Sequence, residues 1–266
     1  MANEEKPCML KTRSMDKPAF FDANCSVGRV GYPHLFDIAD AAGLKQEMAT
    51  AGVEEALAYH TIARDADPRL GNFRLMEEIK GHPELHPVWV VLPHHTAEMP
   101  PPAKLLPEMK ACGVRAVRMF PTKTHHSFSP ADWCAGELLS ALEAGRVPLI
   151  LDAEILPWED VHGLLKTYSH LPIIMANCNY RQNRFLYPLF EKFPNLYVET
   201  SWFMGGGAVE DVIERFGSRP LLFGTNMPRY TGTAAVALIT YADIGRKDKE
   251  AIAGGNLRGI FEGMWP

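Results

Sequence analysis

The stretch Pro220-Leu-Leu-Phe-Gly-Thr-Asn-Met-Pro-Arg-Tyr230 joins a short apolar run to a polar loop that contains a proline and an arginine. Residues 221–223 are apolar at consecutive positions, as expected of a parallel strand that helices cover. Gly224 allows the backbone to turn sharply where that strand ends. The stretch therefore predicts a buried strand whose carboxyl end carries Asn226 and Arg229.

The chain before this stretch repeats the same kind of unit. From Pro18 onward, short apolar runs alternate with longer amphipathic runs, which is the pattern of βα units in a parallel sheet. The expected strands are residues 19–23, 53–60, 86–92, 114–120, 147–152, 172–176, 196–200 and 221–223. The expected helices between them are residues 44–51, 71–80, 103–112, 131–144, 157–168, 186–192 and 207–216. Eight such units predict an α/β fold of the (β/α)8 TIM-barrel type, regular or distorted.

An open, doubly wound sheet is the alternative arrangement of the same elements. No Gly-x-Gly-x-x-Gly turn follows the first expected strand, so a dinucleotide-binding fold has little support. Residues 18–266 are expected to form one barrel domain, because single α/β barrels commonly have this length. Residues 1–17 mix charges with prolines and are expected to form an extended arm.

The composition is that of an ordinary globular protein, with 47% hydrophobic and 22% charged residues and a formal net charge of −5. This charge provides no basic patch to follow a phosphate backbone, so nucleic acid is not an expected partner. No apolar run is long enough to cross a membrane, so no membrane contact is expected. The scattered cysteines and the absence of an apolar signal-peptide core at the start predict a reduced, cytoplasmic location.

The last expected strand and the segment Ile252-Ala-Gly-Gly-Asn-Leu-Arg-Gly-Ile-Phe261 resemble the final strand and closing helix of the amidohydrolase superfamily. The resemblance is to the branch related to aminocarboxymuconate decarboxylase, which usually reads Gly-Ser-Asp-x-Pro at the strand and Gly-Asn-Ala-x-Arg-Leu-Phe at the helix. It extends from Phe20 to Phe261 in strand order and flanking pattern. It implies a (β/α)8 barrel with chemistry at the carboxyl ends of the strands.

The resemblance also implies metal ligands at positions where this chain has other residues. The family reads Asp-x-His-x-His in the first strand, and Asn24 and Ser26 stand at both histidine positions. Asp152 and Asn177 stand at two further histidine positions, and Asn226 replaces an aspartate. Neutral amides are poor ligands for zinc and similar cations. We therefore expect no bound metal and no cofactor.

Polar side chains nevertheless remain at most of these strand ends. The residues expected to bind substrate are Asp22, Asn24, Arg118, Asn177, Asn179, Glu199, Asn226 and Arg229. Alternate residues of a strand point to one face, so Asp22, Asn24 and Ser26 are expected to face the barrel mouth together. Amides and carboxylates suit a hydroxyl-rich or carboxylated small molecule, and arginine suits a ligand carboxylate. Asp22 has an alternative interpretation as a cap for backbone amides.

The expected catalytic residues are Asp152, Glu154 and His60. Asp152 and Glu154 leave the fifth strand two residues apart on one face, where a carboxylate can act as a general base. His60 ends the second strand, and an imidazole with a pKa near neutral can transfer protons. A replacement metal site made of His60, His94 and Asp152 is an alternative, although neither histidine belongs to an i, i+2 or i, i+4 pair.

Several of these residues also have structural interpretations. Asn24 and Asn226 can hydrogen-bond to each other across the position that a metal would take. Arg118 can form an ion pair with Asp152 or Glu154, which is the stronger interpretation if the pair is buried.

The sequence favours a metal-independent hydrolase that acts on a small polar or carboxylated substrate. The alternatives are a lyase or isomerase that uses the same site, and a non-catalytic barrel that binds a small molecule or stabilises a partner. Crowded carboxylates shift one another's pKa, which favours chemistry. A homodimer is expected, either through outer helices that carry the apolar residues Phe185, Leu186 and Tyr187 or through the loop after the fourth strand.

Overall fold

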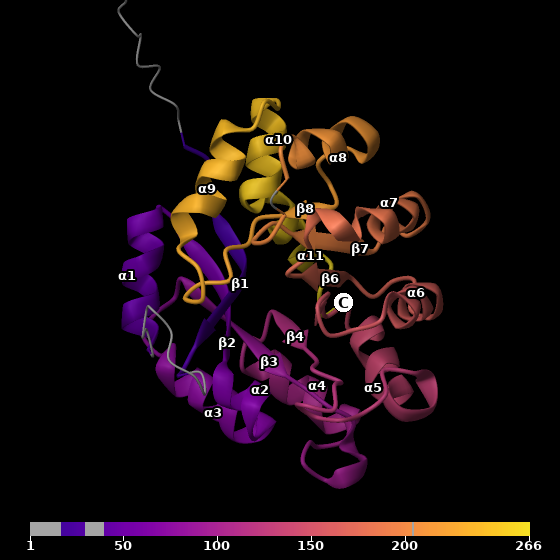
Figure 1. Cartoon of the computed structure of the whole chain (residues 1–266). Coiled ribbons are helices and arrows are strands. Elements are labelled where there is room, and N and C mark those ends of the chain that lie inside the picture. Colours follow the sequence, from indigo (N-terminus) through magenta and orange to yellow (C-terminus); the bar gives the residue numbers. More distant parts are fainter. Residues whose placement is uncertain (1–16, 30–39, 204) are drawn as a thin grey trace, which may run out of the picture.

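The computed structural model describes residues 17–29, 40–203 and 205–266. Its eight strands pair in parallel and in sequence order, as Figure 1 shows in the ring of arrows at the centre of the molecule. They are β1 (Phe21–Val27), β2 (Glu55–His60), β3 (Leu85–Val90), β4 (Ala116–Arg118), β5 (Leu149–Asp152), β6 (Ile173–Ala176), β7 (Leu196–Glu199) and β8 (Leu221–Leu222). The predicted (β/α)8 barrel is confirmed, because a doubly wound sheet does not keep its strands in sequence order.

The ring closes between β1 and the segment that follows β8. The backbone N–H of Ala23 donates to the carbonyl of Phe223, and that of Ser26 donates to the carbonyl of Met227, both at 2.9 Å. Cys25 and Met227 also form a parallel bridge. The first and last strands therefore end at the same edge of the barrel.

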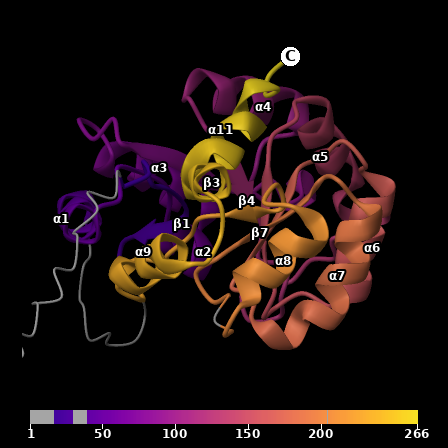
Figure 2. The same ribbon diagram turned by 90° about the horizontal axis from the view of Figure 1, so that it is seen from above.

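Most of the helices form a layer outside the strands, as the two perpendicular views in Figures 1 and 2 show. They are α1 (Ala41–Ala51), α2 (Thr61–Asp65), α3 (Pro68–Glu78), α4 (Pro102–Ala111), α5 (Asp132–Ala144), α6 (Trp158–Thr167), α7 (Asn183–Lys192), α8 (Ala208–Phe216), α9 (Gly232–Tyr241), α10 (Arg246–Glu250) and α11 (Asn256–Glu262). The sequence predicted α1 and α3 to α8 to within a few residues. It did not predict α2, α9 or α10, and a π-helical turn at Ala251–Gly255 precedes α11.

Short polar signals define where some helices begin and end. The Asp40 side chain accepts a hydrogen bond from the Gly43 backbone at 2.8 Å and caps the start of α1. Gly52, with a φ of 76°, ends the same helix in the left-handed conformation that glycine adopts without strain. Asp67 caps α3 in the same manner as Asp40 caps α1.

The apolar core has an inner and an outer part. Leu57, Ile150 and Leu222 fill the interior of the barrel, whereas the alternate strand residues pack outward against the helices. Leu257 and Ile260 of α11 belong to the inner part, so α11 closes the end of the barrel at which the strands begin. Polar side chains line the other end of the barrel, where the strands finish.

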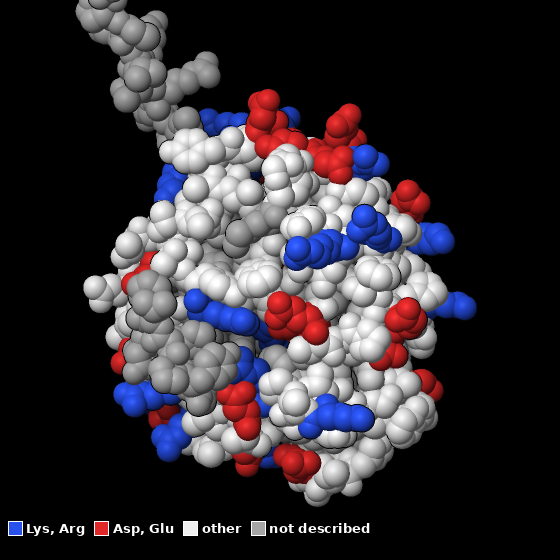
Figure 3. All heavy atoms as spheres, viewed as in Figure 1, with Lys and Arg blue, Asp and Glu red and all other residues white. Residues whose placement is uncertain are grey.

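The surface around this end carries interspersed positive and negative side chains (Figure 3). No described helix is long and apolar enough to cross a membrane.

Phe185 is 47% exposed and stacks on Trp158 at 5.4 Å between ring centroids. Leu186 is fully buried, and the half-buried Tyr187 donates a hydrogen bond to Asp211, so the expectation that Leu186 is exposed was wrong.

Candidate active site

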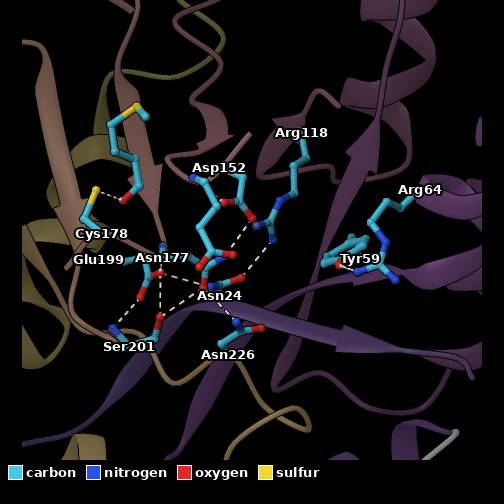
Figure 4. A network of polar contacts seen from close by, with 12 residues as sticks. Asn24, Tyr59, Arg64, Arg118, Asp152, Asn177, Cys178, Glu199, Ser201 and Asn226 are labelled. Carbon is cyan, nitrogen blue, oxygen red and sulfur yellow. Dashed lines mark hydrogen bonds and ion pairs between the residues drawn. The ribbon is translucent and has the colours of Figure 1, made fainter. Parts of the chain in front are cut away.

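Polar side chains from several strands meet inside the barrel at the carboxyl ends of the strands (Figure 4). They come from the strands β1, β4, β5 and β7 and from the residues that follow β6, β7 and β8. We call this group the mouth network, and its members are Asn24, Arg118, Asp152, Asn177, Glu199, Ser201 and Asn226. Five residues of this group were predicted from sequence to bind substrate and one, Asp152, to be catalytic.

Glu199 is the most highly connected acid of the mouth network. Its carboxylate accepts hydrogen bonds from Asn24 Nδ2 at 3.0 Å, from the Asn177 backbone at 2.7 Å and from the backbone and hydroxyl of Ser201 at 2.7 and 2.8 Å. Its side chain is fully buried, and burial raises its pKa while the four donors oppose that rise. Glu199 therefore holds three chain segments together.

Close packing against Gly224 makes room for this carboxylate. A Cβ atom on Gly224 would lie 2.1 Å from Glu199 Oε2, well inside van der Waals contact. The glycine that permits the sharp turn after β8 thus also permits the buried position of Glu199. The sequence predicted the turn but gave no signal for this second requirement.

Arg118 is a buried cation that points at the carboxylate of Asp152. Its Nη1 donates to Asn24 Oδ1 at 2.8 Å, and its Nη2 lies 3.7 Å from Asp152 Oδ2. The guanidinium carbon lies 4.8 Å from the ring centroid of Tyr59 and 5.3 Å from that of Phe120. These contacts fix the guanidinium in place, and they confirm the ion pair with Asp152 that the sequence offered as a structural interpretation.

Asp152 is the only acid of the mouth network that reaches solvent. Its side chain is 14% exposed, whereas Glu199 is fully buried. Asn177 Nδ2 donates to Asp152 Oδ2 at 2.6 Å, and the backbone N–H of Glu154 donates to Oδ1 at 3.0 Å. Asp152 is thus both oriented by the protein and open to a ligand.

Two asparagines support this arrangement through their backbone as well as their side chains. Asn177 and Asn226 both have a φ of 57°, in the left-handed region that asparagine adopts more readily than most residues. Asn226 Nδ2 donates to Asn177 Oδ1 at 2.7 Å. The direct contact between Asn24 and Asn226 that the sequence offered is replaced by a chain of contacts through Asn177 and Glu199.

Asp22 lies beside the mouth network but does not belong to it. Its carboxylate accepts hydrogen bonds from the backbone of Asn24 at 2.9 Å and of Thr225 at 3.0 Å, and from the Thr225 hydroxyl. The expectation that Asp22 and Asn24 share one face was wrong, because the pairing register of β1 shifts between Asp22 and Cys25. Asp22 is the backbone cap of the alternative interpretation, and burial raises its pKa to about 7.

His60 lies against α2, away from the mouth network. Its Nδ1 accepts a hydrogen bond from the Ile62 backbone at 3.1 Å and so caps the start of α2, and burial lowers its pKa. Within the described residues it makes no hydrogen bond to Asp152. His94 instead lies 3.8 Å from Glu137, so the alternative metal site of His60, His94 and Asp152 is not assembled.

Three other predicted site residues lie outside the mouth network. Glu154 is exposed and contacts Asp152 through its backbone. Asn179 caps the short helical turn Tyr180–Gln182, where it accepts from the Arg181 backbone at 2.9 Å. Arg229 is exposed, with its guanidinium 5.4 Å from the ring centroid of Tyr230.

The sequence missed two aromatic members of the site, Tyr59 and Phe120. Phe120 follows Arg118, the last residue of β4, by two residues, and the period-two alternation of an extended chain could have indicated that both side chains point the same way. Tyr59 lies in β2, directly before His60, and belongs to the inner core.

The mouth network does not fit a divalent metal. The oxygens of Asn24 and Asn177 already accept hydrogen bonds from Arg118 and Asn226, and the Arg118 cation lies between Asn24 and Asp152. Within residues 17–29, 40–203 and 205–266, no cluster of three histidine, cysteine, aspartate or glutamate side chains has the geometry of a metal site. Neutral amides beside a fixed cation form a poor ligand set for such an ion.

A family model described as Amidohydrolase matches residues 31–261. The chain belongs to the amidohydrolase family. The resemblance drawn from the strand ends and the closing helix is thereby confirmed. No curated protein matches the chain.

Solved structures share this amidohydrolase fold at low identity. An uncharacterized TIM-barrel protein from Bordetella bronchiseptica is 18% identical, with a TM-score of 0.71 over 92% of this chain and 99% of the other. A dihydroxybenzoic acid decarboxylase from Polaromonas, with bound manganese and 2-nitroresorcinol, is 16% identical, with a TM-score of 0.67 over 92% and 97%. A probable 2-pyrone-4,6-dicarboxylic acid hydrolase from Acinetobacter baumannii, with bound citric acid, is 14% identical, with a TM-score of 0.62 over 91% and 99%.

Proposed function

We propose that this amidohydrolase-family chain is a metal-independent hydrolase that acts on a small polar or carboxylated substrate at the barrel mouth. The observation that carries the proposal is the position of Asp152. It is an oriented carboxylate, 14% exposed, at the carboxyl end of a barrel strand. That end is where barrel enzymes place their reacting groups.

Asp152 acts as the general base in this proposal. It takes a proton from a water molecule while the water oxygen bonds to the acyl carbon of the substrate, and it then returns the proton to the leaving group as the bond between the acyl carbon and that group breaks. Asn177 holds the carboxylate by donating to Oδ2 at 2.6 Å. We assign this role to Asp152 alone, because Glu154 is exposed and His60 caps α2.

A lyase that uses the same site is the second candidate. The fold similarity to a dihydroxybenzoic acid decarboxylase supports it, as does the chemistry of one acid beside a cation. In that reaction the carbon–carboxylate bond breaks, carbon dioxide leaves, and protonated Asp152 gives its proton to the carbon left behind. Labelled water distinguishes the candidates, because a hydrolase places the water oxygen in its product and a decarboxylase releases carbon dioxide.

The test compares Asp152→Asn with the wild type on a panel of carboxylated lactones, amides and hydroxybenzoates. Loss of turnover with a nearly unchanged melting temperature supports the proposal, because the amide keeps the shape and removes the base. Glu159→Gln, an exposed acid at the start of α6, is the matched control and keeps full turnover. Glu154→Gln shows separately whether the second predicted acid takes part.

Two results would contradict the proposal. If Asp152→Asn retains wild-type turnover, Asp152 is not the base. The second result is a wild type that turns over none of these compounds and an Asp152→Asn variant that melts at a lower temperature. Asp152 is then the structural partner of Arg118, and the non-catalytic barrel is the better account.

A further inference from the structure

The guanidinium of Arg118 has donors that the described residues leave unused. A guanidinium carries five N–H donors, and one hydrogen bond, from Nη1 to Asn24 Oδ1 at 2.8 Å, uses one of them. Nε is buried and has no hydrogen-bond partner within the described residues. The distance of 3.7 Å from Nη2 to Asp152 Oδ2 is too long for a hydrogen bond. Buried donors without acceptors are costly and call for an explanation.

The charge of Arg118 is also poorly matched by its neighbours. Asp152 Oδ2 is drawn toward Asn177 Nδ2, at 2.6 Å, rather than toward the guanidinium. Glu199 accepts its hydrogen bonds from Asn24, Asn177 and Ser201 and none from Arg118 within the described residues. A buried cation therefore faces the mouth with one carboxylate at a distance, which is an arrangement that attracts a further anion.

The neighbours of Arg118 hold it ready for such an anion. Tyr59 and Phe120 present their rings to the guanidinium at 4.8 and 5.3 Å, and Asn24 fixes one of its nitrogens. A guanidinium fixed in this way loses little freedom when it binds a carboxylate through two parallel hydrogen bonds. Arg118 itself is buried, with a side-chain exposure of 4%, and the pair meets solvent through Asp152, whose side chain is 14% exposed.

We infer that Arg118 is an anion-binding group that takes, in this chain, the electrostatic place that a divalent metal holds in metal-containing members of the family. It binds a carboxylate of the substrate beside the reacting bond. Two positions at which the resemblance implies metal ligands, Asn24 and Asp152, contact this guanidinium instead. The inference rests on the proposed function for its site, but the binding of the anion requires no turnover.

The test is a calorimetric titration of formate, malonate and benzoate into protein treated with the chelator EDTA. The wild type is expected to bind at least one of these anions. Arg118→Gln is expected to bind it about tenfold to a hundredfold more weakly, because charge-assisted hydrogen bonds are lost. Arg115→Gln is the matched control, since Arg115 is exposed and precedes the same strand at the closed end of the barrel, and its binding stays unchanged.

Two further variants keep the outcome decisive. Arg118→Lys retains the charge without the fork, so it weakens anion binding even if Arg118→Gln fails to fold. Asp152→Asn removes turnover but keeps or strengthens anion binding, because it removes the competing carboxylate. Failure of the proposed function therefore appears as turnover in Asp152→Asn, whereas failure of this inference appears in the titrations. Absence of binding of all three anions to the wild type, or binding by Arg118→Gln and Arg118→Lys as tight as that of the wild type, would overturn the inference.

Discussion

Asp22 offers a sharp test of how this barrel closes, because its carboxylate joins β1 to the segment after β8. It is fully buried and accepts hydrogen bonds from the backbones of Asn24 and Thr225 and from the Thr225 hydroxyl. Burial raises its pKa from 3.8 to about 7, and the hydrogen bonds oppose part of that rise. Asp22→Asn keeps the shape of the side chain and removes the titration.

The sign of the effect follows from where the proton is bound. Between the unfolded pKa of 3.8 and the folded pKa of about 7, the folded protein holds the Asp22 proton and the unfolded chain releases it. The contribution of Asp22 to the free energy of unfolding is therefore fully present below the unfolded pKa, and it is lost as the pH rises through the folded pKa. A shift of about three units corresponds to ~4 kcal/mol in the free energy of unfolding.

The assay is urea unfolding of the wild type and Asp22→Asn, followed by circular dichroism, at several pH values from about 4 to 8. Other groups titrate in both proteins, so their difference isolates Asp22. We expect the wild type to lose stability relative to Asp22→Asn by up to ~4 kcal/mol as the pH rises through this range. A difference that stays constant with pH would refute the reasoning.

Two other replacements test the packing and the surface. Gly224→Ala places a Cβ 2.1 Å from Glu199 Oε2 and is expected to lower the free energy of unfolding by roughly 2–4 kcal/mol, whereas Gly163→Ala, with open space around it, is the near-neutral control. Equal stability of the two variants would contradict this account. A homodimer that uses the exposed Phe185 on Trp158 is expected to dissociate in Phe185→Ser, as measured by light scattering. A wild-type monomer at micromolar concentration would count against it.

Most strands and helices could be predicted from the alternation of apolar runs with the glycines and prolines that separate them. It failed where the pattern was ambiguous. Residues 232–241 form α9, but they are apolar on nearly all sides and lack the stripe that marks a surface helix. The first strand was expected at residues 19–23, because the polar residues after it suggested a loop. The strand β1 lies instead at Phe21–Val27, where its backbone hydrogen-bonds to residues 223 and 227.

Period-two alternation also brought several site residues to the right end of the barrel. It placed Asp152 at the mouth because β5 is regular up to its last residue. It misplaced Asp22 because one shift in the register of β1 turned that side chain away from Asn24. The burial of Glu199, and the choice of Asn24 as the partner of Arg118, depend on residues far apart in the sequence, which no local pattern records.

The central claim is that Asp152 and Arg118 carry out the chemistry of this site without a divalent metal. The most direct measurement determines turnover and metal content on the same sample, before and after treatment with a chelator. We expect turnover to be unchanged in protein that contains no stoichiometric metal, because the mouth network offers amides and a guanidinium at the positions of metal ligands. One zinc, iron or manganese ion per chain whose removal abolishes turnover, and whose return restores it, would contradict the claim.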